Sequence, residues 1–333
     1  MKAIVTAPGG LNALKLVDLP DPGQPGPGEI RVALHASSIN FHDYSVASGR
    51  MPSDGRVLMA DGAGVVEAVG DGVSEFVPGD HVVSGFFPDW QDGPPVSGNF
   101  SRVPGDGIDG FATEYAVRPA TAFTHAPKGF SHVEAATITT AGLTAWRALV
   151  ELGNLKAGDT VLALGTGGVS IFALQIARAM GARVAITSSS DEKLARAREL
   201  GAEFTLNYKT HQDWGKQVMG WTGGRGVDHV VEVGGPGTLA QSIQAVALGG
   251  RITMIGVLTG VSGEVPTAAL MGKQAVLSGI IVGSRRHQQD FVRALDTGIF
   301  RPVIDRVFPL EELADAFRYE ESGAHFGKIG IEW

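Results

Sequence analysis

The chain has 333 residues, more than one hydrophobic core usually serves, so its length favours two domains. Hydrophobic residues make up 44% and charged residues 19%, as in globular rather than disordered proteins. The 27 basic and 35 acidic residues give a formal charge of −8, which disfavours nucleic acid and anionic membranes as partners. Cysteine is absent, so the chain forms no disulfide and offers no thiolate to zinc.

The N-terminal residues have too short an apolar run for a signal peptide, and no apolar stretch is long enough to span a bilayer. We therefore expect a cytoplasmic protein.

Short β-type runs broken by Gly and Pro fill roughly the first 125 residues. The clearest runs are residues 29–35, 64–69, 81–83 and 113–117. This pattern predicts a small all-β module. Residues 87–109 are rich in Pro, Gly and Asp, and we expect them to form a long surface loop, a kind of loop that often has a function.

Apolar strands alternate with helical patterns after Pro127. The predicted strands are residues 160–164, 183–187, 229–233 and 251–255, and the predicted helices are residues 170–180, 191–200 and 289–295. Strand–helix alternation of this kind indicates a parallel, doubly wound sheet, so the fold class is α/β. Residues 301–333 return to short strands and one helix, at 311–319.

A glycine-rich turn is the strongest functional motif. It follows the strand at 160–164 and opens the next helix with Gly165, Thr166, Gly167, Gly168, Val169 and Ser170. In dinucleotide-binding folds such a turn lets backbone amides approach a pyrophosphate, which faces the positive end of the helix. Ser170 replaces the usual third glycine, and a plain strand–helix turn without a ligand is the alternative interpretation.

The end of the second strand indicates which dinucleotide is bound. An acid there binds the adenosine ribose, whereas this strand ends in serines that include Ser188 and Ser189. Serine hydroxyls can donate to a 2′-phosphate, and Lys193 adds a positive charge one turn further on. The sequence therefore favours NADPH over NADH. Two alternatives stay open: Ser189 and Glu192 also fit a helix capping box, and Asp191 could bind the ribose.

Several further segments together carry a family resemblance. They are residues 37–40 (SSIN) with Asp43, residues 61–66 (DGAGVV), residues 79–82 (GDHV), residues 140–146 (TAGLTAW) and the glycine-rich turn. On these motifs the chain resembles the medium-chain dehydrogenase/reductases along nearly its whole length. The resemblance implies a GroES-like β-barrel catalytic domain over residues 1–125, joined by residues 300–333, and a Rossmann NADP-binding domain over residues 126–299. It also implies an active site in the cleft between them.

Zinc-dependent members of this superfamily take their catalytic metal ligands from three of these motifs. The corresponding positions here hold Asn40, Ala60 and Thr140. Alanine cannot ligate, and neutral amide and hydroxyl groups are poor zinc ligands beside thiolate and imidazole. The four-cysteine structural lobe of the family is also missing. We therefore expect no metal, as in the zinc-independent branch that the chain resembles, which includes quinone oxidoreductases and enone reductases.

The same resemblance implies further contacts to the cofactor. The 2′-phosphate would be held by Ser188, Lys193 and Tyr208. The ribose and nicotinamide would lie at Gly234, Gly256 and Val257, and the carboxamide would meet Ile281 and Val282. Phe326 and Lys328, in the C-terminal string HFGK, resemble a closing contact. The alternative for each glycine is a simple turn, and for Tyr208 it is a packed surface ring.

Without a metal, hydrogen bonds must polarise the acceptor oxygen during hydride transfer. The resemblance places four candidate polar side chains near the nicotinamide, namely Asn40, His42, Tyr44 and Thr140. His42 can shuttle a proton near neutral pH, and a locally hydrogen-bonded histidine is the alternative. Trp90 and Phe111 could line a substrate site, although a loop tryptophan can equally cover core.

We expect NADPH-dependent reduction of a quinone or an α,β-unsaturated carbonyl, because charge added to such substrates delocalises. One alternative is a metal-free alcohol dehydrogenase or ketone reductase with His42 as the proton donor, and another is a catalytically quiet NADPH-binding protein with a structural or regulatory role. Residues 275–282 (AVLSGIIV) form an apolar strand that could pair with a second copy, so we expect a homodimer. A buried internal strand is the alternative for this segment.

Overall fold

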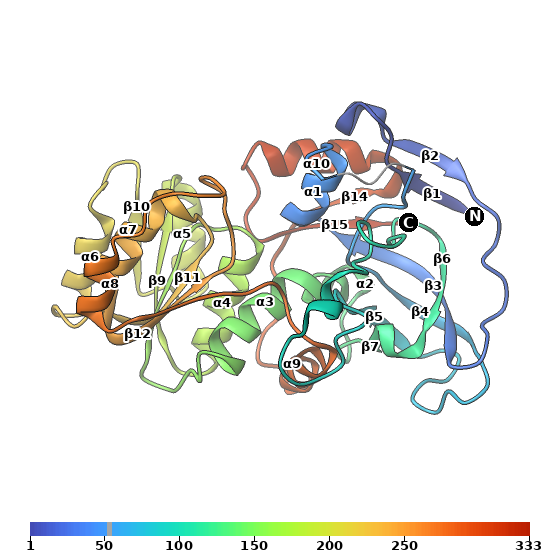
Figure 1. The fold of residues 1–333 in the computed structure, drawn as a ribbon, viewed down its shortest axis with the longest axis horizontal. Helices are drawn as coiled ribbons and strands as arrows, with labels where there is room; N and C mark the ends of the chain where they lie inside the picture. Colours follow the sequence, from blue (N-terminus) through green and yellow to red (C-terminus); the bar gives the residue numbers. More distant parts are fainter. Residues whose placement is uncertain (52–54) are drawn as a thin grey trace. The chain divides into compact units, whose positions relative to one another are not determined.

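The computed structural model describes residues 1–51 and 55–333. These residues divide into two compact units: unit 1 comprises Met1–Leu143 and Val282–Trp333, and unit 2 comprises Thr144–Ile281 (Figure 1). The chain therefore leaves unit 1 once and returns to it near its end. Each unit has its own large sheet, which confirms the predicted α/β class with one β-rich domain and one doubly wound domain.

The division between the units differs from the boundaries expected at 125/126 and 299/300. Helix α2 (His132–Ala136) packs on strands of unit 1, and helix α9 (Arg285–Leu295) also belongs there. The Gln288 amide of α9 donates to the carbonyl of Ser84 at 3.0 Å and to the hydroxyl of Thr124 at 2.8 Å. These tertiary contacts, which local sequence patterns do not encode, extend unit 1 at both of its boundaries.

A seven-stranded sheet forms the frame of unit 1. Its order is β14-β15-β3-β4-β5-β7, with β6 also paired to β3. The strands are β3 (Glu29–Ser38), β4 (Ala63–Val69), β5 (His81–Ser84), β6 (Tyr115–Pro119), β7 (Phe123–His125), β14 (Ile304–Pro309) and β15 (Lys328–Glu332). A separate hairpin pairs β1 (Lys2–Val5) with β2 (Lys15–Asp18). Because β15 lies antiparallel to β3, the C-terminal segment completes the sheet that the N-terminal segment begins.

Alternation of apolar residues explains why β3 is a central strand. Ile30, Val32 and Leu34 are buried on one face, in a core that includes the rings of Phe111 and Phe123. Burial of each such side chain stabilises the fold by about 1.5–3 kcal/mol.

The two glycines of the DGAG motif, Gly62 and Gly64, lie where neighbouring atoms leave no room for a side chain. A Cβ atom on Gly64 would lie 2.0 Å from the carbonyl oxygen of Ala33, and one on Gly62 would lie 2.7 Å from the Phe111 ring. Any larger residue at either position would push the strand or the ring aside.

The helices of unit 1 are α1 (Phe41–Ala47), α2, α9 and α10 (Leu313–Glu321), and α3 (Leu143–Trp146) lies at the boundary with unit 2. Two short π-helical turns, Ile138–Gly142 and Arg147–Glu151, flank α3. Residues 87–109 form the predicted long loop with one 3-10 turn, Ser97–Phe100. Trp90 is buried and packs against the rings of Phe87 and Phe100, so it covers core and anchors the loop.

Unit 2 contains a six-stranded parallel sheet of order β10-β9-β8-β11-β12-β13. The strands are β8 (Thr160–Ala163), β9 (Arg183–Ser188), β10 (Phe204–Asn207), β11 (Val227–Glu232), β12 (Val246–Met254) and β13 (Val276–Gly279). The helices are α4 (Gly168–Ala179), α5 (Asp191–Glu199), α6 (Trp214–Trp221), α7 (Pro236–Ala245) and α8 (Thr267–Lys273). If the six strands are numbered 1 to 6 along the chain, their order in the sheet is 3-2-1-4-5-6, the order of a Rossmann sheet. In such sheets ligands bind where the strand order reverses, which here is between β8 and β11.

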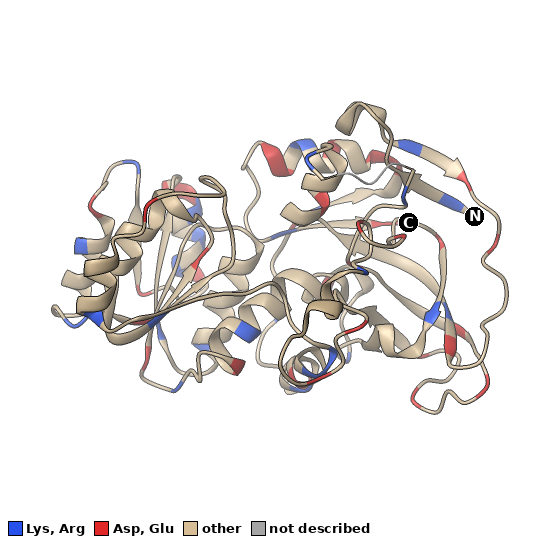
Figure 2. Cartoon of the chain, in the orientation of Figure 1, with Lys and Arg blue, Asp and Glu red and all other residues tan. Residues whose placement is uncertain are grey.

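Charged residues of both signs are dispersed over both units in Figure 2. Among the described residues, no helix is long and apolar enough to cross a membrane.

Three histidine rings stack where β3, β5 and α2 meet in unit 1. The centroid of the His132 ring lies 4.7 Å from that of His35 and 4.9 Å from that of His81. Burial lowers the pKa of His132 to about 4, and the neighbouring His35 and His81 add to the effect. The folded state therefore favours a neutral His132.

We predict that acid weakens unit 1 through His132. The pKa of His132 is lowered from its ordinary value of 6.5 to about 4 on folding. Between these values the unfolded chain binds more protons, so stability falls as the pH falls. Since the ring is partly exposed, we expect a loss of about 1–2 kcal/mol between about pH 7 and pH 5. Urea unfolding at both pH values measures it. His132→Gln should flatten the pH dependence of the free energy of unfolding, whereas substitution of the exposed His211 by Gln should leave it unchanged. An unchanged slope in His132→Gln would contradict the assignment of this dependence to His132.

Candidate functional site

The glycine-rich turn of unit 2 connects β8 to α4 as the sequence predicts. Gly165 has a φ of +75°, which favours glycine, and Gly167 is the N-cap of α4. No side chain caps this helix, and its first turn carries no acidic residue. The hydroxyl of Ser170 donates to the carbonyl of Leu164 at 2.5 Å instead. The positive helix end is thus left without a protein anion, and the turn fits a pyrophosphate.

The turn is also joined to the end of β9. The amide of Gly165 donates to the Thr187 hydroxyl at 3.3 Å, and the hydroxyls of Thr166 and Ser188 lie 3.4 Å apart. Val169 is half-buried at the start of α4. One ligand can therefore reach both the phosphate-binding turn and the end of the second strand.

The predicted 2′-phosphate residues gather at the carboxyl ends of β9 and β10. Ser188 is buried and pairs in register with Asn207, while Ser189 and Lys193 are half-buried and Tyr208 is exposed. The capping interpretation of Ser189 is wrong by one residue, because the hydroxyl of Ser190 is the one that accepts from the Lys193 amide.

Asp191, the first residue of α5, also follows the end of β9. It is exposed, and its carboxylate accepts from the Asn207 amide at 2.9 Å. The end of β9 therefore offers both a cation, Lys193, and an anion, Asp191, to an adenosine ribose.

Gly234, Gly256 and Val257 lie just beyond β11 and β12, where the ribose and nicotinamide were expected. A Cβ atom on Gly256 would lie 2.4 Å from the carbonyl oxygen of Val233. Sequence reasoning missed Glu232, the buried carboxylate that holds this region together. It accepts from the amides of Gly234 and Gly235, at 2.8 and 3.1 Å, and from two hydroxyls of α7, those of Thr238 and Ser242.

Ile281 and Val282 lie on either side of the second unit boundary. Ile281 is the last residue of unit 2 and is 60% exposed, and its carbonyl accepts from the Arg147 guanidinium at 3.1 Å. Val282 is buried in unit 1 with a φ of +42°, an unusual value for a β-branched residue. Their predicted contact with the carboxamide stays a prediction.

The catalytic candidates lie in unit 1, at the end of β3. Asn40 is the N-cap of α1, and Asp43 completes a capping box with it. The Asn40 amide nitrogen donates to Asp61 at 2.8 Å, to Asp43 at 3.0 Å and to the Ser38 carbonyl at 3.1 Å. Its donors are therefore engaged inside the protein and are not directed at a substrate.

Asp61 is fully buried and links these groups to Thr140. It accepts from the hydroxyl of Ser38 at 2.5 Å, from Asn40, and from the hydroxyl of Thr140 at 2.6 Å. Burial raises the pKa of Asp61 to about 6, with Asp43 adding to the rise and Lys328 opposing it. A fraction of this carboxyl is thus protonated at neutral pH and can donate to Thr140, which is half-buried.

Lys328 is the cation of this buried cluster. Its ammonium donates to the carbonyl of Ile39 and, at 2.6 Å, to the side-chain oxygen of Asn40. Burial lowers the pKa of Lys328 although Asp61, Glu320 and Asp43 face it. The sequence suggested a closing contact to the cofactor, whereas the structure gives this ammonium partners inside unit 1.

Phe326, the other residue of that predicted contact, is 1% exposed and its ring also lies within unit 1. Glu320 approaches Lys328 from helix α10, and burial raises the pKa of this carboxyl to about 8. Glu320 is therefore largely neutral at pH 7, and the charges that face Lys328 are chiefly those of Asp43 and Asp61.

The other two catalytic candidates lie on α1. The hydroxyl of Tyr44 donates to Glu321 at 2.5 Å and is thereby turned toward α10. His42 lies between two carboxylates, with Nδ1 3.6 Å from Asp43 and Nε2 3.7 Å from Asp106. Burial alone would lower the pKa of His42, but the two carboxylates outweigh burial and raise it. Neither ring nitrogen lies within hydrogen-bond distance of a described residue, but both lie within ion-pair distance of a carboxylate, so the alternative of a histidine that is held locally stays open.

The residues at the three positions that carry zinc ligands in zinc-dependent members do not fit a metal here. Asn40 and Thr140 both bond to Asp61, Ala60 has no ligating atom, and the Ala60 amide donates to Asp43 at 2.8 Å. Over residues 1–51 and 55–333, no cluster of three His, Cys, Asp or Glu residues could hold a metal ion.

We predict that Lys328→Met destabilises unit 1 by about 3–5 kcal/mol, because it leaves buried carboxylates without their cation. Urea unfolding measures the loss. Lys128→Met is the matched control, since the Lys128 side chain is 86% exposed and should change stability by less than about 0.5 kcal/mol. Equal effects of the two substitutions would show that the buried ammonium does not stabilise the cluster.

Two family descriptions match the chain: an alcohol dehydrogenase GroES-like domain over residues 26–128 and a zinc-binding dehydrogenase over residues 168–297. A zinc-type alcohol dehydrogenase-like protein of Schizosaccharomyces pombe is 41% identical over 97% of this chain and 96% of that protein. A solved NAD-dependent alcohol dehydrogenase is 38% identical with a TM-score of 0.90, over 100% of both chains. A quinone oxidoreductase of Pseudomonas syringae pv. Tomato DC3000 is 28% identical with a TM-score of 0.82, over 100% of this chain and 99% of that one.

These likenesses extend over both units and agree with the turn between β8 and α4. They set aside the alternative of a catalytically quiet protein. The chain belongs to the medium-chain dehydrogenase/reductase superfamily and is an oxidoreductase that uses a nicotinamide cofactor.

Proposed function

We propose that the enzyme transfers a hydride from NADPH to a quinone or an α,β-unsaturated carbonyl without a metal. The observation that carries the proposal is the 2.6 Å hydrogen bond between Thr140 and the buried carboxyl of Asp61. Thr140 occupies one of the positions from which zinc-dependent members bind their metal, and Asp61 directly follows another, Ala60. The family descriptions name zinc, yet Asn40, Ala60 and Thr140 do not supply a zinc donor set.

Bound NADPH would supply the hydride, which adds to the electron-poor carbon of the acceptor and leaves negative charge on its oxygen. The hydroxyl of Thr140 gives its proton to that oxygen. A protonated Asp61 then donates its own proton to Thr140 across the same 2.6 Å contact, which reverses the bond in which Thr140 donates to the carboxylate. Since Thr140 is half-buried, protons from solvent return to Asp61 by the same route between turnovers. One hydride and one proton are consumed for each acceptor reduced.

Quinones and enones suit this arrangement because the charge they gain is delocalised. The donor here is a neutral hydroxyl backed by a carboxyl group, which polarises an oxygen less strongly than a metal ion would. An acceptor that needs little polarisation is therefore favoured over a simple ketone.

We predict that Thr140→Ala lowers turnover with quinones or enones by about 100-fold and leaves NADPH affinity unchanged, because it removes the proton relay only. Thr140→Ser should keep most of the activity, and Asp61→Asn should lower turnover. Steady-state assays and cofactor titration separate the two effects. Ser45→Ala is the control, since the Ser45 hydroxyl bonds to the Phe41 carbonyl on α1 and contributes nothing to the relay. Wild-type turnover in Thr140→Ala would refute the relay.

A metal-free alcohol dehydrogenase or ketone reductase is the second candidate, and His42 is the observation that favours it. The imidazole has a raised pKa, lies between Asp43 and Asp106, and makes no hydrogen bond to a described residue. Such a ring can donate a proton to an alkoxide. Activity confined to ketones and secondary alcohols, and lost in His42→Gln, would establish this candidate in place of the first.

The choice of NADPH over NADH rests on the end of β9. Ser188 and Ser189 offer hydroxyls, Lys193 offers a positive charge, and Tyr208 is exposed beside them. The exposed carboxylate of Asp191 opposes a phosphate, but its bond to Asn207 draws it toward β10.

We predict that nicotinamide fluorescence shows tighter binding of NADPH than of NADH, and that Lys193→Ala weakens only the NADPH complex, by about tenfold. Lys209→Ala is the control, as an exposed lysine beyond β10. Preferential binding of NADH would overturn the assignment of the 2′-phosphate and leave the rest of the proposal intact.

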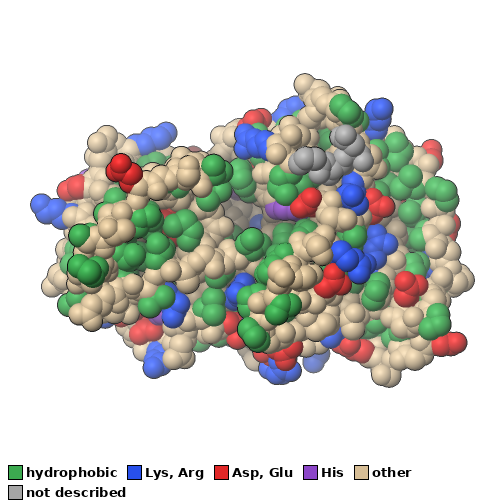
Figure 3. Space-filling view, in the orientation of Figure 1, with side chains coloured by type: hydrophobic (Ala, Val, Ile, Leu, Met, Phe, Trp, Pro, Cys, Tyr) green, Lys and Arg blue, Asp and Glu red, His purple; other side chains and the backbone are tan. Residues whose placement is uncertain are grey.

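A homodimer formed through β13 is also part of the proposal. This strand ends the sheet order, so the alternative of a buried internal strand is not what the structure shows. Val276 in β13 is 43% exposed, while Met271 in α8 and Ile281 just after the strand are 76% and 60% exposed. Figure 3 shows hydrophobic side chains gathered on the visible face of unit 2. Light scattering that finds only monomers at micromolar concentration would refute the dimer.

A further inference from the structure

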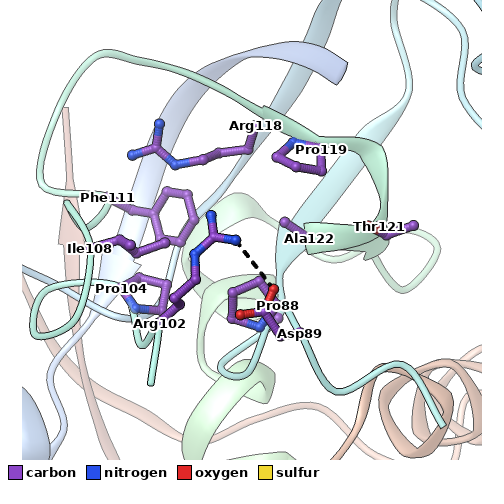
Figure 4. A pocket seen from close by; sticks show the side chains of 11 residues that line it. Pro88, Asp89, Arg102, Pro104, Ile108, Phe111, Arg118, Pro119, Thr121 and Ala122 are labelled. Carbon is purple, nitrogen blue, oxygen red and sulfur yellow. Dashed lines mark hydrogen bonds and ion pairs between the residues drawn. The ribbon is translucent and has the colours of Figure 1, made fainter. Parts of the chain in front are cut away.

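A small pocket in unit 1 has a lining unlike that of the sites described above. It lies beside the loop of residues 87–109, the end of β6 and the start of β7, and has a volume of about 50 Å³ (Figure 4). A cavity of this size has room for a few non-hydrogen atoms, since a single water needs about 10–15 Å³ by the same measure. Its apolar lining includes Phe111, Ile108 and Pro104, and two arginines, Arg102 and Arg118, also line it.

Arg118 contributes a positive charge that no carboxylate bonds to among the described residues. Its guanidinium donates to two carbonyls, that of Val117 at 2.9 Å and that of Asp109 at 3.2 Å. The Nε atom is buried and has no hydrogen-bond partner in the described part of the chain. A buried, charged donor without an acceptor costs about 1–3 kcal/mol or more, and an anion in the pocket would offset that cost.

Burial lowers the pKa of Arg118 and the charge of Arg102 adds to the fall, while the carboxylates of Asp109 and Glu29 oppose it. Over residues 1–51 and 55–333, Arg102 makes one ionic contact, with Asp89 at 3.4 Å, which is longer than a good hydrogen bond of this type. Figure 4 shows both guanidinium groups beside the Phe111 ring. The two guanidinium charges repel each other, and Asp89 bonds to Arg102 alone, so an anion in the pocket would be attracted by both arginines.

We infer that this pocket binds the carboxylate of a small organic acid with a short apolar stem, at a site separate from the dinucleotide turn and the Asp61 cluster. The planar guanidinium groups match a carboxylate, and the stem would lie on Phe111, Ile108 and Pro104. The carboxylate of Asp89 lines the same pocket and disfavours a dianion such as phosphate.

The pocket wall is already ordered, so binding requires little rearrangement. The carbonyl of Val103 accepts from the amides of Asp106, Gly107 and Ile108, and the Gly105 amide donates to the Ile108 carbonyl. A Cβ atom on Gly107 would lie 2.2 Å from the carbonyl oxygen of Ser101, so this turn is closely packed. Binding to such a preformed wall loses little conformational entropy.

The probe for this inference is propionate, titrated into the full-length protein without NADPH or acceptor, so the outcome is independent of the proposed function. We expect saturable binding with a Kd of about 1 mM in calorimetry, and magnetisation transfer from protein to the propionate methyl group in NMR. Propionamide has the same stem without the charge and should not bind. Phosphate should bind at least about tenfold more weakly than propionate.

Arg102→Gln and Arg118→Gln should each weaken propionate binding about tenfold or more. Because Arg118 is half-buried, Arg102→Gln is the variant that keeps the test valid if Arg118→Gln does not fold. Arg318→Gln is the matched control, an exposed arginine paired with Asp315 on α10, and should bind like the wild type. Absence of propionate binding, equal binding of phosphate, or unchanged affinity in Arg102→Gln would each overturn the inference.

Discussion

The buried ammonium of Lys328 is the group on which the polar interior of unit 1 depends. It bonds to Asn40 and to the Ile39 carbonyl, and it faces the carboxylates of Asp43 and Asp61. Those carboxylates in turn fix the start of α1 and the hydroxyl of Thr140. A buried charge is tolerated only when it is paired and hydrogen-bonded. Removal of any one member therefore leaves the other charges buried without a partner, which destabilises the fold. This requirement gives a physical reason for the return of the C-terminal strand to unit 1.

In the proposed function, the same cluster would activate the acceptor without a metal. A metal ion would stabilise the developing charge directly, whereas two ionised carboxylates beside the site would oppose it. Burial of Asp61 lessens this conflict, because a pKa of about 6 leaves part of the carboxyl protonated and able to supply a proton. Lys328 limits the rise, and the balance between burial and Lys328 keeps the pKa of Asp61 near the range in which it can exchange protons with Thr140.

Features that depend on short stretches of chain were predictable. The turn from Gly165 to Ser170 was found because a strand, a glycine turn and a helix follow one another locally, and the C-terminal strands were placed with unit 1 by resemblance. The N-cap at Ser190 was missed by one residue, since neighbouring serines offer equivalent hydroxyls. Strand β6 begins two residues later than expected because Thr113 and Glu114 bond to the first strand instead.

Long-range pairings could not be read from the sequence. Lys328 and Asn40 are 288 residues apart, and nothing near either residue indicates the other. Glu232 looks like an ordinary strand residue until α7 brings Thr238 and Ser242 against it. The unit boundaries shifted for the same reason, because α2 and α9 are assigned by what they pack against.

The central claim is that Asp61 and Thr140 perform in this chain what a metal performs in its zinc-dependent relatives. The most direct measurement is turnover with NADPH and a quinone or enone on protein treated with a strong zinc chelator, with metal content determined on the same sample. The account predicts unchanged turnover in protein that holds no stoichiometric zinc. Turnover that is lost on chelation and restored by added zinc would contradict it.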